Sequence, residues 1–158
     1  MTLSALVITV STRASAGVYE DRSGPVIATA LAELGFQVDG PLVVPDGDQV
    51  GQALRDGVEQ GYAVLITTGG TGLNPHDHTP EQTRGLLDYE IPQLPAALAR
   101  YGADHGVPTA LLSRGLAGVS GRSLVVNLPG SSGAARDAMV VLGPVLGHAV
   151  SQIRGGDH

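Results

Sequence analysis

The chain has 158 residues, a formal net charge of −6, only 3% aromatic residues and no cysteine. This length suits one domain over residues 1–158, and the lack of cysteine excludes a disulfide framework and a thiolate metal site. An acidic chain with few aromatic rings lacks the basic face and the stacking platforms of nucleic-acid binders, so we expect no nucleic-acid partner. The sequence shows no signal-peptide pattern and no apolar run near ~20 residues, which predicts a cytoplasmic protein without a membrane segment.

The first half of the chain alternates short apolar runs with segments of helical period. The apolar runs predict strands over residues 5–10, 36–44 and 63–67. The helical periods predict helices over residues 24–34 and 49–60. Gly40 and Pro41 break the second strand, while Ser23 can cap the first helix and Pro25 suits its first turn. Both faces of the strands are apolar, which favours a parallel sheet covered by helices.

The second half begins with a helix-start signal. Thr79 can cap this helix, Pro80 suits its first position and Gln82 can complete a capping box. The later helices are predicted over residues 92–105 and 134–154, the second interrupted at 143–144, and the later strands over 111–119 and 123–127. The order β-α-β-α-β-α-α-β-β-α predicts an α/β fold, a three-layer α/β/α sandwich with a mostly parallel central sheet.

Four polar loops follow predicted strands. They cover residues 11–24, 45–48, 69–80 and 128–133. In open sheets of this kind, ligands bind beyond the carboxyl ends of the strands. We therefore expect the four loops to gather at one edge of the sheet and to form the ligand site there.

Gly69-Gly70-Thr71-Gly72 forms the start of the third of these loops. The three glycines permit positive φ and a close backbone approach to a ligand, and successive N–H groups in such a turn can bind an anion. The loop is either a phosphate cradle before a helix N-terminus or a tight turn that needs glycine for its geometry alone. The chain has no lysine, so a bound phosphate would be held by N–H groups, arginine or a metal ion.

Asp77 lies in the same loop, where a carboxylate would repel a phosphate unless a cation lay between them. Mg²⁺ suits this place because it takes carboxylate oxygens together with substrate phosphates. Asp46 ends another strand and can face Asp77, and two carboxylates around a metal-bound triphosphate suit nucleotidyl transfer. Alternatively, Asp46 and Asp48 are turn residues beside Pro45 and Gly47.

His76 and His78 flank Asp77 and can place two imidazoles near one zinc ion, although no third strong ligand stands nearby. The alternative is that His76 faces solvent or a phosphate and that His78 is structural. Residues 127–131, Asn-Leu-Pro-Gly-Ser, form either a second backbone clamp or a helix cap. Residues 11–15 are rich in donors and include an arginine that can hold a phosphate, or they form an ordinary surface loop.

Together these stretches resemble the molybdenum-cofactor biosynthesis proteins of the MogA/MoaB type, which include the G domain of gephyrin. The matching stretches are VSTRASAGVYEDRSGP (10–25), VVPDG (43–47), TTGGTGLNPHDHTPE (67–81), LSRG (112–115) and NLPGS (127–131). The resemblance implies a molybdopterin-binding domain fold, usually a homotrimer. It also implies a reaction in which molybdopterin attacks the α-phosphate of Mg-ATP, giving adenylyl-molybdopterin and pyrophosphate, before another protein inserts the molybdenum.

By motif match, Asp46 and Asp77 correspond to the acidic pair that positions Mg²⁺ and the nucleotide. The resemblance implies substrate-binding roles for Gly69, Gly70, Thr71 and Gly72, for Ser11, Arg13 and Ser15 on the pterin side, and for Asn127, Pro129, Gly130 and Ser131 after the last strand. One departure is His76, because the family commonly has a basic residue there, as in Arg-Asp, and a neutral imidazole supplies less charge beside a triphosphate. His78 also replaces a residue that is often β-branched. The alternative function is therefore a non-catalytic molybdopterin-binding carrier or a scaffold paralogue.

Overall fold

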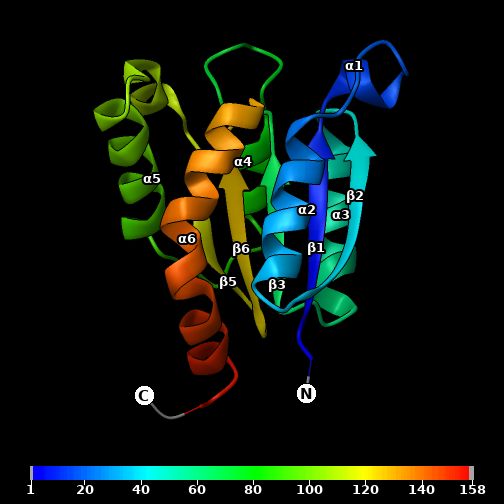
Figure 1. Ribbon diagram of the computed structural model, residues 1–158. Coiled ribbons are helices and arrows are strands. Elements are labelled where there is room, and N and C mark those ends of the chain that lie inside the picture. Colours follow the sequence, from blue (N-terminus) through cyan, green and yellow to red (C-terminus); the bar gives the residue numbers. More distant parts are fainter. Residues whose placement is uncertain (1, 157–158) are drawn as a thin grey trace.

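The computed structural model describes residues 2–156, which form a six-stranded sheet with helices on both faces (Figure 1). The strands are β1 (Ser4–Val10), β2 (Gln37–Val44), β3 (Val64–Thr68), β4 (Tyr89–Glu90), β5 (Ala117–Ser120) and β6 (Ser123–Leu128). Their order across the sheet is β2-β1-β3-β6-β5-β4. The first four of these run parallel, while β5 is antiparallel to both of its neighbours. The predicted α/β sandwich with a mostly parallel sheet is therefore confirmed.

The helices are α1 (Thr12–Ser15), α2 (Ser23–Glu33), α3 (Asp48–Glu59), α4 (Thr79–Arg84), α5 (Gln93–Asp104), the 3₁₀ helix η1 (Pro108–Leu112) and α6 (Ser132–Ile153). In Figure 1, α2 and α6 lie in front of the sheet with α5 beside α6, and α3 lies behind it. None of the helices within residues 2–156 combines the length and the apolar character that crossing a membrane requires.

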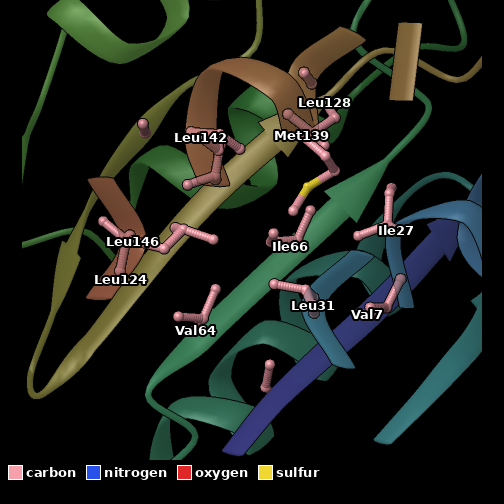
Figure 2. Close-up of a cluster of buried hydrophobic side chains, with 14 of the residues drawn as sticks. Val7, Ile27, Leu31, Val64, Ile66, Leu124, Leu128, Met139, Leu142 and Leu146 are labelled. Carbon is pink, nitrogen blue, oxygen red and sulfur yellow. The ribbon is translucent and has the colours of Figure 1, made fainter. Parts of the chain in front are cut away.

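Successive strand residues point to opposite helix layers, because side chains alternate along a strand. The larger core cluster fills the space between the sheet and the helices α2 and α6 (Figure 2), and includes Val7, Ile66, Leu31 and Leu142. The cluster on the other face includes Ile8, Leu65 and Leu54, the last from α3. Burial on both faces explains why the central strands β1, β3 and β6 consist mostly of apolar residues.

Helix α6 runs unbroken for 22 residues although Pro144 lies inside it. A proline in a helix removes one main-chain hydrogen bond and crowds the preceding turn. Leu142 and Leu146, on either side of the proline, are fully buried against the sheet, whereas Pro144 is exposed. Apolar burial on this face outweighs the lost hydrogen bond. The interruption predicted at residues 143–144 is therefore wrong.

The segment before β5 also differs from the prediction of a strand over residues 111–119. Residues 108–112 form η1, and pairing with β6 begins only at Ala117. Pro108 has a fixed φ and no N–H group, which suits the first turn of a helix. The short elements α1 and β4 were not predicted, because their four and two residues are too few to show a period.

The hydroxyl caps predicted at Ser23 and Thr79 do not form. The hydroxyl of Ser23 hydrogen-bonds with that of Thr68 at 3.1 Å, and the N–H of Gly24 donates instead to Asp21 Oδ1 at 3.0 Å. The start of α2 is thus held by the carboxylate of Asp21 and by the end of β3. The local sequence signal correctly located this helix. The Ser23 side chain does not cap it, however, because its hydroxyl hydrogen-bonds with Thr68 of β3.

Helix α4 begins at Thr79, yet the Thr79 hydroxyl donates to the main-chain oxygen of Gly69 at 3.0 Å. The Nε2 of Gln82 donates to Asp48 Oδ1 at 3.4 Å, so no capping box forms. Thr79 therefore joins the helix to the glycine loop, and Gln82 joins it to the start of α3. This fastens the start of α4 to the glycine loop described below.

The buried side of α6 should contribute more to the stability of the fold than its exposed side. Leu142 is fully buried and Val140, on the same helix, is 56% exposed. We expect Leu142→Ala to lower the free energy of unfolding by about 2–5 kcal/mol, because it removes transfer energy and leaves a cavity. Val140→Ala should change it by less than about 1 kcal/mol. Denaturant unfolding followed by circular dichroism measures both, and equal losses in the two variants would contradict the described packing of α6.

Candidate active site

The loops that follow β1, β2, β3 and β6 meet at one edge of the sheet, at the top of Figure 1. Main-chain hydrogen bonds join them in pairs: the N–H of Ser11 donates to Val44 O and the N–H of Gly69 donates to Leu128 O, each at 2.9 Å. Parallel strands that end at the same edge bring these loops together, as expected from the sequence.

Gly69 and Gly70 are the two positions of the loop where glycine is required by backbone conformation, with φ of 104° and 70°. A Cβ atom on Gly69 would overlap the carbonyl oxygen of Val10. A Cβ atom on Gly70 would overlap the hydroxyl of Thr79 and lie 2.6 Å from Asp46 Oδ2. These glycines let the loop lie directly against β1 and against a carboxylate.

Gly72 was also expected to use its conformational freedom, but its φ is not positive. Its N–H donates to Asp77 Oδ2 at 3.1 Å, and a Cβ atom on it would lie 2.8 Å from the same oxygen. The N–H of Asp77 donates to Asn74 O at 2.9 Å. Glycine at position 72 therefore leaves room for the Asp77 carboxylate, which a larger residue would push aside.

The carboxylates of Asp46 and Asp77 come from different loops and lie against the same glycine loop. The N–H of His78 donates to Asp46 Oδ1 at 3.0 Å, beside the Gly72–Asp77 bond just described. Partial burial raises the pKa of Asp46 and the negative charge of Asp77 raises it further, while the hydrogen bond from His78 acts in the opposite direction. Two carboxylates that repel each other could share a divalent cation with oxygen ligands, and Mg²⁺ at this place stays a prediction.

The two histidines beside Asp77 do not build a zinc site. His76 and His78 are both exposed. Within residues 2–156 there is no group of three or more His, Cys, Asp or Glu residues that could hold a metal ion. Zinc therefore lacks its third protein ligand here, whereas Mg²⁺ can complete its shell with phosphate oxygens and water.

Two clefts open beside the glycine loop. The α1 cleft has a volume of about 370 Å³ and the η1 cleft about 290 Å³. The α1 cleft is lined by residues that include Ser11, Tyr19, Asp21, Ser23, Thr68, Gly69 and Ser132. The η1 cleft is lined by residues that include Thr71, Gly72, Asp77, Leu112, Ser113 and Pro129. Gly70, Gly130 and Ser131 line both clefts and form the wall between them.

Of the residues predicted on the pterin side, Ser11, Arg13 and Ser15, not all line a cleft. Ser11 lines the α1 cleft and its hydroxyl accepts the N–H of Ala14 at 3.1 Å, which caps α1. The guanidinium of Arg13 lies 5.5 Å from the ring centre of Tyr19. The exposed hydroxyl of Ser15 donates to Thr12 O at 3.0 Å. Only Ser11 among the three therefore lines either of the clefts beside the glycine loop.

The end of β6 is buried and structural, whereas the loop after it is open to the clefts. Asn127 is buried, and its amide N–H groups donate to the hydroxyls of Thr67 at 2.9 Å and Thr83 at 3.1 Å. Its amide oxygen accepts the N–H of Leu116 at 3.0 Å, so this side chain holds strands and α4 together. Ser131 caps α6 by accepting the N–H of Ala134 at 3.1 Å while lining both clefts.

Sequence reasoning gave no role to Arg114 in the LSRG stretch. Its guanidinium donates to the main-chain oxygens of Gly72 and Asp77 and to the carboxylate of Glu81. Asp21 was missed as well, although it binds both the hydroxyl of Thr9 at 2.8 Å and the start of α2. Both residues lie within stretches that match the family, which is the only sequence signal that could have found them.

Residues 6–148 match the model of a family described as "Probable molybdopterin binding domain". The chain belongs to this family. It is 35% identical over 155 residues to the molybdopterin adenylyltransferase of Helicobacter pylori (strain J99). The matched region covers 94% of this chain and 86% of that protein. A solved structure described as MogA matches with a TM-score of 0.92 at 53% identity, covering 95% of this chain and 99% of that one.

The family also includes larger proteins. The chain is 38% identical over 155 residues to the molybdenum cofactor biosynthesis bifunctional protein of Synechococcus elongatus, covering 98% of this chain but 48% of that protein. The chain thus spans about half or less of the length of the first curated relatives it matches. These matches place it in molybdenum cofactor biosynthesis, as the sequence motifs predicted.

The conformation of Gly70 gives a test of the site geometry. We expect Gly70→Ala to lower the free energy of unfolding by about 1–3 kcal/mol, because alanine disfavours positive φ and its Cβ would crowd Thr79 and Asp46. Gly85→Ala is the matched control, since no atom lies within 4 Å of its added Cβ. Thermal unfolding measures both variants. A stable Gly70→Ala protein would show that the loop does not adopt this conformation.

Proposed function

We propose that this protein is a molybdopterin adenylyltransferase, which transfers AMP from ATP to molybdopterin and releases pyrophosphate. The observation that carries the proposal is the pair of carboxylates, Asp46 and Asp77, held by main-chain N–H groups against a glycine loop. This loop lies between two clefts that share a wall, an arrangement that suits two substrates whose phosphates must meet. Relatives that carry this enzyme's name support the same activity.

In the proposed reaction, an oxygen of the terminal phosphate of molybdopterin attacks the α-phosphorus of ATP. The bond from that phosphorus to the oxygen bridging to pyrophosphate breaks, and pyrophosphate leaves with the bonding electrons. The attacking phosphate is already ionised, so the protein needs no strong general base. Its task is to place the two groups in line and to offset their negative charges.

The main chain supplies donors for this task. The main chain of Gly70 in the glycine loop and of Gly130 and Ser131 before α6 lies at the shared wall of the two clefts, whereas the N–H groups of Gly69 and Gly72 are already used inside the protein. Oriented N–H groups and a helix N-terminus favour anions without a positively charged side chain. This agrees with a chain that lacks lysine.

Asp46 and Asp77 are the residues that would hold Mg²⁺. The fit rests on their separate origins, on the oxygen character of both groups and on the raised pKa of Asp46, which burial and the nearby Asp77 cause. When bound, Mg²⁺ would neutralise phosphate charge and draw electron density from the α-phosphate. The proposal also includes a homotrimer, a cytoplasmic location and delivery of the product to a molybdenum-insertion protein, which rest on the family resemblance.

The carboxylate of Asp77 should be essential for turnover. We expect Asp77→Asn to leave the fold intact and to lower turnover at least ~10-fold, equal to about 1.4 kcal/mol of barrier, because it removes a negative ligand without changing shape. The measurement is formation of adenylyl-molybdopterin and pyrophosphate from molybdopterin, ATP and Mg²⁺. Asp48→Asn is the control, because Asp48 is an exposed carboxylate at the start of α3. Equal activity in wild type and Asp77→Asn would contradict the mechanism.

His76 motivates a second candidate function, a molybdopterin-binding carrier or scaffold without turnover. Its imidazole is exposed on the loop that carries Asp77, at a position where the family commonly has a basic residue such as arginine. If this hypothesis holds, the wild-type protein binds molybdopterin but forms no adenylyl product. His76→Arg should then create activity, because a permanent positive charge would stand beside the nucleotide phosphates. Turnover by the wild-type protein, or an inactive His76→Arg protein, would count against the carrier hypothesis.

A further inference from the structure

Arg114 lies between η1 and β5, and it reaches across to both ends of the loop that carries Asp77. Its Nε donates to Gly72 O at 2.9 Å and its Nη2 donates to Asp77 O at 2.9 Å. Its Nη1 donates to Glu81 Oε2 at 2.7 Å. Its own main-chain N–H donates to Thr71 O at 2.8 Å. One residue therefore contacts the loop before and after the exposed residues 73–76.

Through these contacts Arg114 holds the main chain around the Asp77 carboxylate without binding the carboxylate itself. The main-chain oxygen of Gly72 is held by Arg114, while the N–H of Gly72 is donated to Asp77 Oδ2 at 3.1 Å. The main-chain oxygen of Asp77 is held by the same guanidinium. The carboxylate of Asp77 is thus fixed relative to Gly72 from both sides, through main-chain atoms that Arg114 orders.

The charge of Arg114 is balanced elsewhere. Glu81, in the first turn of α4, forms the ion pair with Arg114, and the hydrogen bond from Arg114 lowers the pKa of the Glu81 carboxyl. Arg114 approaches Asp77 at its main-chain oxygen, so the Asp77 carboxylate remains turned to Gly72. The Asp77 carboxylate therefore remains available to bind a cation.

We propose that Arg114 is a positioning residue that sets the direction of the Asp77 carboxylate, and that Glu81 orients Arg114 for this task. The inference rests on the proposed adenylyl transfer. Its chemical basis is the planar guanidinium, which presents several donors in a fixed fork and can bind three acceptors at once. A lysine keeps the charge at this position but cannot span the oxygens of Gly72, Asp77 and Glu81 together.

The test compares Arg114→Lys with wild type and with the control Arg84→Lys. Arg84 lies on α4 and forms a longer, exposed ion pair of 4.0 Å with Glu90, so its variant should keep wild-type behaviour. We expect Arg114→Lys to lower kcat at least ~10-fold and to raise the half-saturating Mg²⁺ concentration at fixed ATP several-fold, because a misdirected carboxylate binds the cation less well. A loss of folded protein alone would lower kcat without moving the Mg²⁺ dependence.

A second readout needs no turnover. Amide hydrogen exchange followed by NMR should show faster exchange at Gly72 in Arg114→Lys, with unchanged exchange at core amides such as that of Ile66. Wild-type kcat and Mg²⁺ dependence in Arg114→Lys would overturn the inference. If Arg114→Lys does not fold, Glu81→Ala is judged by the same criteria. A wild-type protein that forms no product would refute the proposed function, and Gly72 exchange would still decide whether Arg114 orders the loop.

Discussion

The site depends on how closely the chain can approach itself where the central strands end. Gly69 lies against the carbonyl oxygen of Val10, where a side chain would overlap, and a Cβ atom on Gly130 would lie only 3.2 Å from the Cα atom of Gly69. Three segments that are far apart in sequence therefore touch through main-chain atoms. Because no side chains separate them, a ligand can approach the main chain of this loop closely.

Polar side chains at the ends of the buried strands keep this contact in register. Thr67 and Thr83 bind the amide of Asn127, and the hydroxyl of Thr68 donates to Pro129 O at 2.8 Å. A buried polar group without a partner would cost about 1–3 kcal/mol, so each of these bonds disfavours any shift between β3, β6 and α4. The apolar core holds the strands together. The hydrogen bonds of Asn127 and Thr68 in addition fix the positions of the loops that follow these strands.

The sequence predicted what is determined locally and missed what depends on distant contacts. Apolar runs located the central strands, and the glycine and aspartate motifs predicted which edge of the sheet binds the ligand. The signals at Ser23 and Thr79 were correct for helix starts but wrong for the caps, because Thr68 and Gly69 take those hydroxyls. Gly72 does not have the positive φ that its sequence suggested, and a Cβ atom there would instead crowd the Asp77 carboxylate. Arg114 binds a residue 42 positions earlier, and no local pattern could have revealed that.

The shared wall between the clefts restricts how this site can change during evolution. Gly70 and Gly130 contribute only backbone to that wall, and the side chain of Ser131 is occupied in capping α6. Any larger residue at these positions would take space from both clefts at once, so selection cannot enlarge or reshape one cleft there without altering the other. New substrate preferences must instead arise at the outer walls, from residues such as Tyr19 on one side and Leu112 on the other.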